Sequence, residues 1–385
     1  MVHGWKLKLV IALLKTSIAL EVFRYARNIR RTRILLRAIQ EKIRQYRGPR
    51  SIRKVSYVNR KYYWDMYGEG WPSEGFKRNV ARECRRIESQ GHHQTGLRNV
   101  LFGITTKCPL QCEHCYEWKN LNIPERLSYS DLEVSISKLI DHGVGQIHLG
   151  GGEPMMRYDD ILRLVSQFSH RVGFWIVTSG YGVTAERARA LQQAGLIGLC
   201  VSLDHHRETD HNQFRNHRNA YAMAQEAVEA GRKSGLVTSL SICSTRQYTT
   251  KENLQSYIEL ARAWGVSFVQ LIEPKAVGHY EGKNVTLSDQ QKKMLLDFFL
   301  KINDDPRYED YPITIYHEYY QPTLGCRGAG NGTFYIDPLG EAHPCPFCRH
   351  PSGNVVTDSI EHCIQQMRSH GCRVSELSTR LESLA

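Results

Sequence analysis

The chain lacks an apolar run long enough to cross a membrane. The nearest candidate is the segment 9–20, but Lys15 lies within it and Glu21 follows it, whereas a membrane-spanning helix needs roughly 18 uncharged apolar residues. No small-residue cleavage site accompanies the segment, so a secretory signal peptide is not expected. We therefore expect a cytoplasmic protein whose membrane contact is limited to the inner surface of the bilayer.

Acidic residues are scarce in the first 60 positions. This stretch holds 16 of the 51 Lys and Arg residues but only two of the 39 acids, a net charge of +14 that leaves the rest of the chain at −2. Residues 5–47 contain no proline or glycine, and the apolar positions among the arginines of residues 24–50 predict a basic amphipathic helix. Residues 1–50 could lie on an anionic membrane or dock on the body of the protein. Nucleic acid is the less favoured partner because no aromatic platform or known motif accompanies the charge.

The cysteines do not form the even set of a secreted disulfide scaffold. Eleven occur, and eight of them fall into two clusters, a pattern typical of metal binding in a reducing compartment. The first cluster, Cys108, Cys112 and Cys115, offers three thiolates and no obvious fourth. Three thiolates leave one iron of a four-iron cluster open to another ligand. A zinc site completed by His114 is the alternative, although zinc favours paired Cys-x2-Cys knuckles.

From residue 100 onward, short apolar segments alternate with amphipathic ones. The expected strands are 100–104, 146–149, 172–177, 199–203, 237–243 and 268–272, and the expected helices are 129–142, 159–168, 184–194, 220–234, 251–264 and 288–303. Such alternation predicts parallel strands joined by right-handed crossovers. Six units are fewer than the eight of a closed barrel, so we expect an α/β fold, a partial (β/α)6 barrel.

Four regions are expected along the chain. They are a basic helical segment at 1–54, an aromatic-rich lead-in at 55–97, the partial barrel at 98–310 and a cysteine-rich extension at 311–385. The lead-in predicts a hairpin followed by a helix from Ser73. It would serve either as a lid over the site or as packing against the barrel, and nothing in residues 1–97 indicates a winged-helix module.

Polar motifs follow the strands at their carboxyl ends, where parallel α/β barrels carry their active sites. These motifs are the cysteine loop, Gly151–Pro154, Thr178–Gly180, Ser202–Asp204 and Glu273. We expect them to meet at one site.

With these motifs the chain resembles the radical S-adenosylmethionine (SAM) enzymes over roughly residues 98–300. Their first signature is the Cys-x3-Cys-x2-Cys loop after the first strand, here with Tyr116 beside the last cysteine, and their second is the Gly-Gly-Glu-Pro run after the second strand. The resemblance implies that Cys108, Cys112 and Cys115 hold three irons of a [4Fe–4S] cluster. SAM would chelate the fourth iron.

The resemblance also implies which residues contact SAM. Gly151 and Gly152 would let the backbone approach the methionine amino group, where a Cβ would clash, while Glu153 and Pro154 fix the turn. Arg215 would neutralise the cofactor carboxylate, although Asn212 stands where the family often has Asp. The implied contact residues are Tyr116, Gly151, Gly152, Glu153, Pro154, Thr178, Ser179, Ser202, Asp204 and Arg215.

An electron from a flavodoxin or ferredoxin would cleave SAM to a 5′-deoxyadenosyl radical, which abstracts hydrogen from a substrate. In such chemistry the protein contributes orientation and the exclusion of water. The sequence identifies neither the substrate nor a catalytic acid or base.

The second cysteine cluster resembles the opening of the auxiliary-cluster extensions called SPASM and twitch domains. A full SPASM set has seven cysteines and only five occur here, which implies a shortened extension with one auxiliary [4Fe–4S] cluster. Cys326, Cys345 and Cys348 are the first three expected ligands, and Cys363 or Cys372 or a substrate would be the fourth. A zinc site or structural thiols are the alternatives. The turn residues Asp337–Gly340 predict a hairpin within this extension.

Two classes of function follow. The first is a radical SAM enzyme, acting near the membrane on a ribosomally made peptide or on a smaller molecule. The second is a non-catalytic iron–sulfur protein for electron transfer or redox sensing, which the Gly151–Pro154 motif argues against because an electron carrier needs no SAM site.

Overall fold

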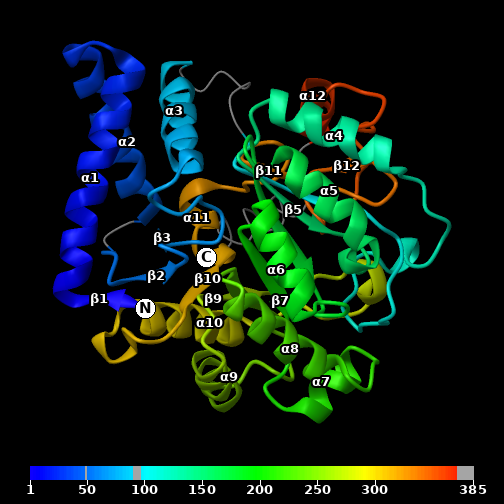
Figure 1. Cartoon of the computed structure of the whole chain (residues 1–385). Coiled ribbons are helices and arrows are strands. Elements are labelled where there is room, and N and C mark those ends of the chain that lie inside the picture. The colour runs from blue at the N-terminus through cyan, green and yellow to red at the C-terminus, as the bar shows by residue number, and fades with distance from the viewer. Residues whose placement is uncertain (48–49, 90–96, 371–385) are drawn as a thin grey trace, which may run out of the picture.

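A nine-stranded, mainly parallel sheet forms the body of the computed structural model, which describes residues 1–47, 50–89 and 97–370 (Figure 1). The strand order is β10-β9-β8-β7-β6-β5-β4-β11-β12. The strands are β4 (Asn99–Gly103), β5 (Gln146–Gly150), β6 (Gly173–Thr178), β7 (Gly198–Ser202), β8 (Val237–Cys243), β9 (Phe268–Ile272), β10 (Ile313–Tyr316), β11 (Thr333–Ile336) and β12 (Ala342–His343). Among the described residues no pairing joins β10 to β12, so the sheet is open.

The helices cover the outer face of this sheet (Figure 1). From residue 97 onward the described helices are α4 (Tyr129–Asp141), α5 (Tyr158–Phe168), α6 (Ala185–Ala194), α7 (Glu208–Phe214), α8 (Ala220–Lys233), α9 (Lys251–Ala263), α10 (Asp289–Asp304), α11 (Gln321–Leu324) and α12 (Ile360–His370). Side-chain oxygens accept the free backbone N–H groups at several of their starts, as Ser128 does for α4 and Ser288 for α10. The α/β fold class and the six expected strand–helix units are confirmed, each boundary to within one residue.

Two further strands extend the six expected ones. β10 adds in parallel to β9 and β11 adds in parallel to β4, where Phe334 pairs with Val100. The strand β10 was not predicted from the sequence, and β11 was predicted only as one arm of the hairpin with β12, which is confirmed. As a result the C-terminal extension continues the barrel sheet directly, beside the strand that precedes the cysteine loop.

The lead-in closes the amino end of the barrel. It comprises the hairpin of β2 (Lys54–Val58) and β3 (Lys61–Tyr63) and the helix α3 (Glu74–Glu88), capped by Ser73 as expected. Tyr63 and Met66 pack in one buried cluster with Trp175 and Phe268, which lie at or near the amino ends of their strands. The lead-in therefore packs against the barrel, at the end opposite the cysteine loop.

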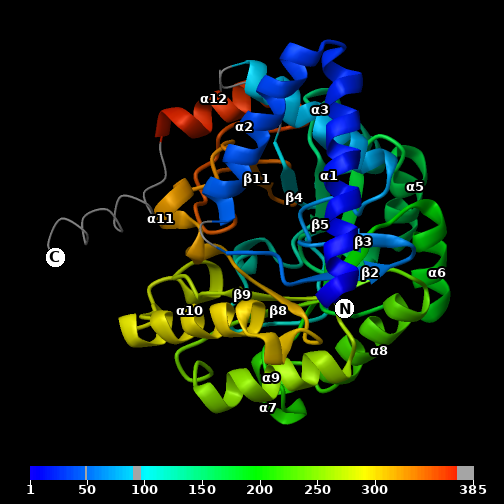
Figure 2. The ribbon, with the colours of Figure 1, turned by 90° about the vertical axis from the view of Figure 1, so that its left-hand side faces the viewer.

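The basic N-terminal segment is two helices rather than one. α1 (Gly4–Ala26) and α2 (Ile29–Arg47) are separated at Arg27, whose φ of 51° is left-handed. They pack with α3 on one side of the molecule (Figures 1 and 2), and β1 (Val2–His3) pairs with β2 to complete a small three-stranded sheet that was not foreseen. None of the helices described in the structure is both long and apolar enough to cross a membrane.

Candidate active site

The three cysteines of the first cluster gather in one small apolar cluster at the carboxyl end of β4. Cys112 is buried with Leu110 and Ala220, and Cys108 and Cys115 pack against it, as does Met223. Burial raises the pKa of Cys108 to about 12 and also raises the pKa values of Cys112 and Cys115. The thiols therefore share a water-poor environment, as ligands of a single cluster would.

The Gly151–Pro154 turn packs directly against the backbone of the cysteine loop. The N–H of Gly152 donates to the carbonyl of Thr105 at 2.8 Å, and that of Glu153 to the carbonyl of Lys107 at 2.7 Å. A Cβ at Gly151 would lie 2.7 Å from the Thr105 oxygen, and one at Gly152 would lie 2.3 Å from the Lys107 oxygen. Here the glycines allow the approach of the cysteine loop, and the close approach to SAM stays a prediction.

The loop that follows β9 holds the other side of the cysteine loop. The N–H of His279 donates to the carbonyl of Cys115 at 2.9 Å, and its ring Nδ1 lies 3.1 Å from the carbonyl oxygen of Cys112. A Cβ at Gly278 would meet the Cys115 oxygen at 2.2 Å, and the His279 ring stacks on Trp118 with centroids 3.9 Å apart. This contact was not predicted from the sequence, because its only signal there is a glycine in a polar loop.

A buried ion pair lies next to Cys112. Arg215 donates through two nitrogens to Oδ2 of Asp204, at 2.7 and 2.6 Å, and Asp204 Oδ1 accepts from the N–H of Cys243 at 2.9 Å. Burial would raise the pKa of Asp204, but the positive charge of Arg215 outweighs it and lowers the pKa to about 2. Burial raises the pKa of Cys112, and the positive charge of Arg215 acts against that rise. The predicted site residues Asp204 and Arg215 are thus brought together beside the cysteines, with a fixed positive charge.

Glu153 ties the ends of β5 and β6 together. Its carboxylate is buried and accepts from Thr178 Oγ1 at 2.7 Å, Ser179 Oγ at 2.6 Å and the N–H of Ser179 at 2.8 Å. Burial raises the pKa of Glu153, while these hydrogen bonds act to lower it. Glu153 therefore holds Thr178 and Ser179 in place, and the buried Pro154 follows it in the turn. Their contact with SAM stays a prediction.

Solvent reaches the inner face of the sheet near the carboxyl ends of its strands. On each of five strands the outward-facing residues near this end are buried, but one inward-facing residue is only half-buried. These half-buried residues are Leu101, Val177, Ser202, Ser241 and Ile272. The level below is closed by aromatic rings, with Tyr67 stacked on His148 and His148 on Trp175. Burial lowers the pKa of His148 to about 3, so the ring is neutral. The predicted residue Ser202 therefore lies where a substrate could reach it.

An acid pair bridged by a lysine lies at the ends of β9 and β10. Lys275 Nζ is 3.2 Å from Oε2 of Glu273 and 3.7 Å from Oε1 of Glu318, and Tyr316 donates to Glu273 at 2.7 Å. Burial, followed by the charge of Glu273, raises the pKa of Glu318 to about 7, and Glu318 Oε2 is buried without a hydrogen-bond partner. Glu273 was among the polar residues predicted at the strand ends. Glu318 was not, because the strand β10 was not recognised in the sequence.

The C-terminal extension brings the segments of three cysteines together. The N–H of Cys348 donates to the carbonyl of Cys345 at 3.1 Å. The loop that follows Cys326 lies beside them, because the N–H of Ala329 donates to the carbonyl of Pro344, the residue before Cys345, at 2.9 Å. Cys363 instead lies in the main hydrophobic core. Cys372 lies outside the described residues, so the fourth ligand stays a prediction.

The two cysteine regions are joined by a buried polar bridge. Glu117, two residues after Cys115, is almost fully buried and forms an ion pair with Arg349, the residue after Cys348. Tyr335 of β11 donates to the same carboxylate at 2.5 Å. The predicted residue Tyr116 packs edge-on against Tyr335 and Phe347, with centroids 5.7 and 6.4 Å apart. The bridge fixes the position of one cysteine loop relative to the other.

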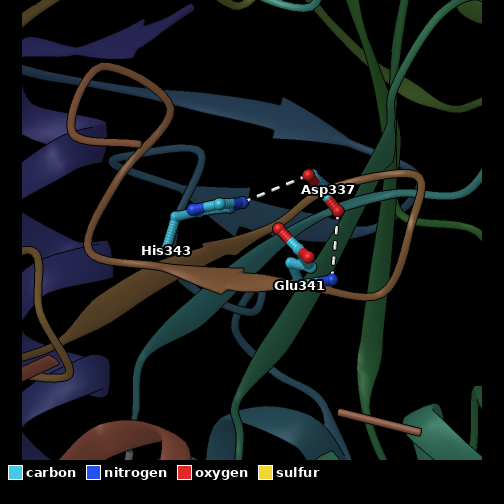
Figure 3. Close-up of side chains that lie close together, drawn as sticks. All are labelled: Asp337, Glu341 and His343. Atoms are coloured by element: carbon cyan, nitrogen blue, oxygen red, sulfur yellow. Dashed lines mark hydrogen bonds and ion pairs between the residues drawn. The ribbon is translucent and has the colours of Figure 1, made fainter. Parts of the chain in front are cut away.

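The described residues contain one close set of metal-ligand side chains, and it includes no cysteine. A tetrahedral zinc site with Zn–S bonds of about 2.3 Å brings its sulfurs within about 4 Å of one another. Among the described residues no three cysteine sulfurs lie within 4.8 Å of each other. The one close set of ligand-type side chains is Asp337, Glu341 and His343 (Figure 3). There Asp337 accepts from the N–H groups of Leu339 and Glu341 and pairs with His343, so it stabilises the hairpin turn.

Known proteins match both the sequence and the fold. The family model of the radical SAM superfamily matches residues 102–262. A mycofactocin maturase, MftC of Mycolicibacterium smegmatis, is 26% identical over 270 residues, 67% of each chain. An AdoMet-dependent heme synthase of Methanosarcina barkeri is 26% identical over 284 residues, 67% of this chain and 79% of that protein. Over residues 102–262 the chain is therefore similar to the radical SAM superfamily, and the two relatives extend that similarity to about two thirds of its length.

Solved structures share the fold of this chain. Streptococcus suis SuiB bound to S-adenosylmethionine has a TM-score of 0.57 at 14% identity, covering 75% of this chain and 70% of SuiB. The enzyme anSMEcpe with bound AdoMet has a TM-score of 0.56 at 16% identity, covering 72% and 83% of the two chains. The cofactors of the enzyme are a [4Fe–4S] cluster and SAM, and the three thiols in their apolar cluster provide a fitting set of ligands for that [4Fe–4S] cluster.

Proposed function

We propose that this radical SAM enzyme modifies a peptide and that its C-terminal extension holds an auxiliary [4Fe–4S] cluster. The observation that carries the proposal is the bridge of Glu117 to Arg349 and Tyr335, which binds the extension to the cysteine loop. A cysteine-rich extension held this closely is suited to act on the same substrate as the SAM site. Relatives named as maturases support a peptide substrate, as does the structural neighbour SuiB, solved with the precursor peptide SuiA at a TM-score of 0.57 and 16% identity, over 78% of this chain and 72% of SuiB.

Each group of residues has a defined part in this function. When bound, the cluster and SAM supply a 5′-deoxyadenosyl radical after reduction by one electron, for which a flavodoxin or ferredoxin is the proposed donor. Cys108, Cys112 and Cys115 hold the cluster, while Leu110 and Met223 keep water away from it. Arg215, held by Asp204, offers its positive charge to the carboxylate of SAM. The half-buried inner face of the sheet receives the substrate.

Label transfer tests the peptide proposal. A precursor peptide encoded beside the gene, deuterated at its side chains, is incubated with reconstituted enzyme, SAM and dithionite without oxygen. We expect deuterium in the released 5′-deoxyadenosine and a matching mass change in the peptide. Release of unlabelled 5′-deoxyadenosine from every encoded peptide, with label arriving only from a small molecule, would contradict a peptide substrate.

Iron counting tests the auxiliary cluster. Two cubane clusters hold about eight irons per chain, and the Cys345→Ala/Cys348→Ala double variant is expected to retain about four. Wild-type protein with about four irons would contradict the auxiliary cluster. Cys363→Ala decides the fourth ligand: a loss of iron would assign Cys363, and an unchanged count would leave the position to Cys372 or to substrate.

We also propose that residues 1–50 bring the enzyme to the inner face of a cytoplasmic membrane. The support is the net charge of +14 over residues 1–60, since basic segments are attracted to anionic lipids. Deleting residues 1–50 should abolish co-sedimentation with anionic vesicles and leave SAM cleavage intact. Unchanged co-sedimentation would remove the membrane proposal alone.

A further inference from the structure

Helix α1 is apolar on two opposite faces. One face packs against the body of the protein through Leu7, Val10, Val22 and Ala26, all of which are buried. A helix that is apolar all round is normally buried on every side. α1 instead forms the outer edge of the molecule (Figures 1 and 2), so its second apolar face has no cover within the described chain.

The uncovered face carries a stripe of large apolar side chains, interrupted by the exposed Thr16 between Leu13 and Leu20. Its members are Trp5, Leu9, Leu13, Leu20 and Phe23, which are 67%, 56%, 61%, 53% and 48% exposed. At about 100° of rotation per residue they fall within an arc of roughly 80°. The stripe runs along nearly all of the 23-residue helix, a length of about 35 Å. Exposed apolar surface gathered in this way marks an interaction site.

Cations flank the stripe on both sides. By the same rotation Lys6 and Arg24 lie about 20° beyond one border, whereas Lys8 and Lys15 lie about 60° and 80° beyond the other, toward the face that packs on the body. All four are exposed. The single acid of α1, Glu21, is on the side facing the body, where its side chain is 13% exposed and pairs with Arg24. Long cationic side chains in this position can bury their stems in an apolar layer and keep their charges at its anionic surface.

We propose that α1 lies flat on an anionic lipid surface, with the stripe of Trp5, Leu9, Leu13, Leu20 and Phe23 inserted among the lipids. The charges favour lipid over a second copy of the chain, because two stripes packed together would bring cations against cations. Trp5 at one end of the stripe is suited to the membrane interface, where an apolar ring with one polar N–H is favoured.

This inference rests on the proposed membrane association of residues 1–50 and changes which residues carry it. The sequence placed the membrane-binding amphipathic helix among the arginines of residues 24–50. In the structure the apolar side of that helix, α2, is used for packing on the body, where Leu35 and Ile39 are buried with Phe76. The lipid contact therefore belongs to α1, and α2 supplies additional positive charge.

Vesicle flotation of the full-length holoenzyme tests the stripe. The test variant is Leu9→Ser/Leu13→Ser/Leu20→Ser, and the matched control is Ile29→Ser/Ile34→Ser, which removes exposed apolar side chains from α2. With vesicles of phosphatidylcholine and 30% phosphatidylserine, the affinity of the test variant should be at least about tenfold lower than that of wild type, because apolar insertion is lost. The control should bind like wild type, and vesicles of phosphatidylcholine alone should bind wild type weakly.

Tryptophan fluorescence, SAM cleavage and the oligomeric state show whether a loss of vesicle binding comes from misfolding or self-association instead. Trp5→Phe should remove part of the vesicle-induced blue shift of tryptophan fluorescence while retaining SAM cleavage. Unchanged flotation of the triple variant, loss confined to the α2 control, or a wild-type dimer that the triple variant abolishes would each overturn the inference. Failure of SAM cleavage in wild type would instead count against the enzymatic function, so the two failures are distinguishable.

Discussion

At the scale of single residues, the glycines before Glu153 illustrate how closely the site is packed. Gly150 and Gly152 are two positions apart, yet a Cβ at Gly150 would meet nothing nearer than 3.4 Å, whereas a Cβ at Gly152 would lie 2.3 Å from the Lys107 carbonyl oxygen. An alanine at Gly150 therefore tests the effect of an added methyl group alone, whereas an alanine at Gly152 also tests its clash with the cysteine loop.

Gly152→Ala should displace the cysteine loop, because the obstructing atom belongs to the backbone. We expect the iron that the first cluster binds, about four per chain, to be mostly lost, as measured by iron analysis after anaerobic reconstitution. Gly150→Ala is the matched control and should retain it. Equal iron content in the two variants would show that the glycine contact does not position the loop.

The buried acid Glu318 predicts a pH dependence of stability. Its pKa is raised to about 7 from the ordinary value of 4.5, so the folded protein binds the proton more tightly than the unfolded chain does. Stability from this group is present below pH 4.5 and is lost as pH rises toward 7. The free energy of unfolding in urea should therefore fall more steeply between pH 5 and 7 in wild type than in Glu318→Gln. Parallel profiles would contradict the shift.

At the scale of elements, the sequence predicted the repeated units but not how the edges are used. The strand–helix units were recognisable because buried parallel strands are nearly all apolar and helices follow with capping residues such as Ser288. β10 and β11 are four residues each, and no crossover helix comparable to α4 follows either. Such short strands gain their identity from pairing with β9 and β4, which local sequence does not encode.

The candidate site divides in the same way. Motifs with fixed spacing, the cysteine loop and Gly151–Pro154, were found from sequence. Contacts made across the fold were not: His279 on the cysteine loop, Glu318 beside Glu273, and Arg349 with Glu117. Each of these pairs joins segments that no motif links, so only the folded chain brings them together.

The Glu117–Arg349 bridge predicts a large cost for a single substitution. Arg349→Met would leave the Glu117 carboxylate buried without its cation, which typically costs about 3–5 kcal/mol. Lys293→Met, which breaks the exposed pair with Asp297, should cost about 0.5 kcal/mol or less. Urea denaturation of the holoenzyme measures both. A small and equal loss in the two variants would mean that the bridge does not hold the extension to the cysteine loop.

At the scale of the whole molecule, the two ends of the barrel have different tasks. The amino end is closed by the lead-in, with Tyr63 and Met66 in its cluster, and the carboxyl end carries the cysteine loop and the half-buried inner face. The N-terminal helices lie to one side, away from the strand β7 (Figure 1). This arrangement allows α1 to bind a surface without covering the site, and it places the C-terminal extension beside β4, the strand that precedes the cysteine loop.

The central claim is that Cys108, Cys112 and Cys115 form the site of SAM cleavage. The most direct measurement is the amount of 5′-deoxyadenosine released from SAM by anaerobically reconstituted enzyme with dithionite, quantified by mass spectrometry. We predict release by wild type and by Cys84→Ala, whose thiol lies among the N-terminal helices, and none above background by Cys112→Ala. Absence of release by wild type, or equal release by Cys112→Ala, would contradict the account.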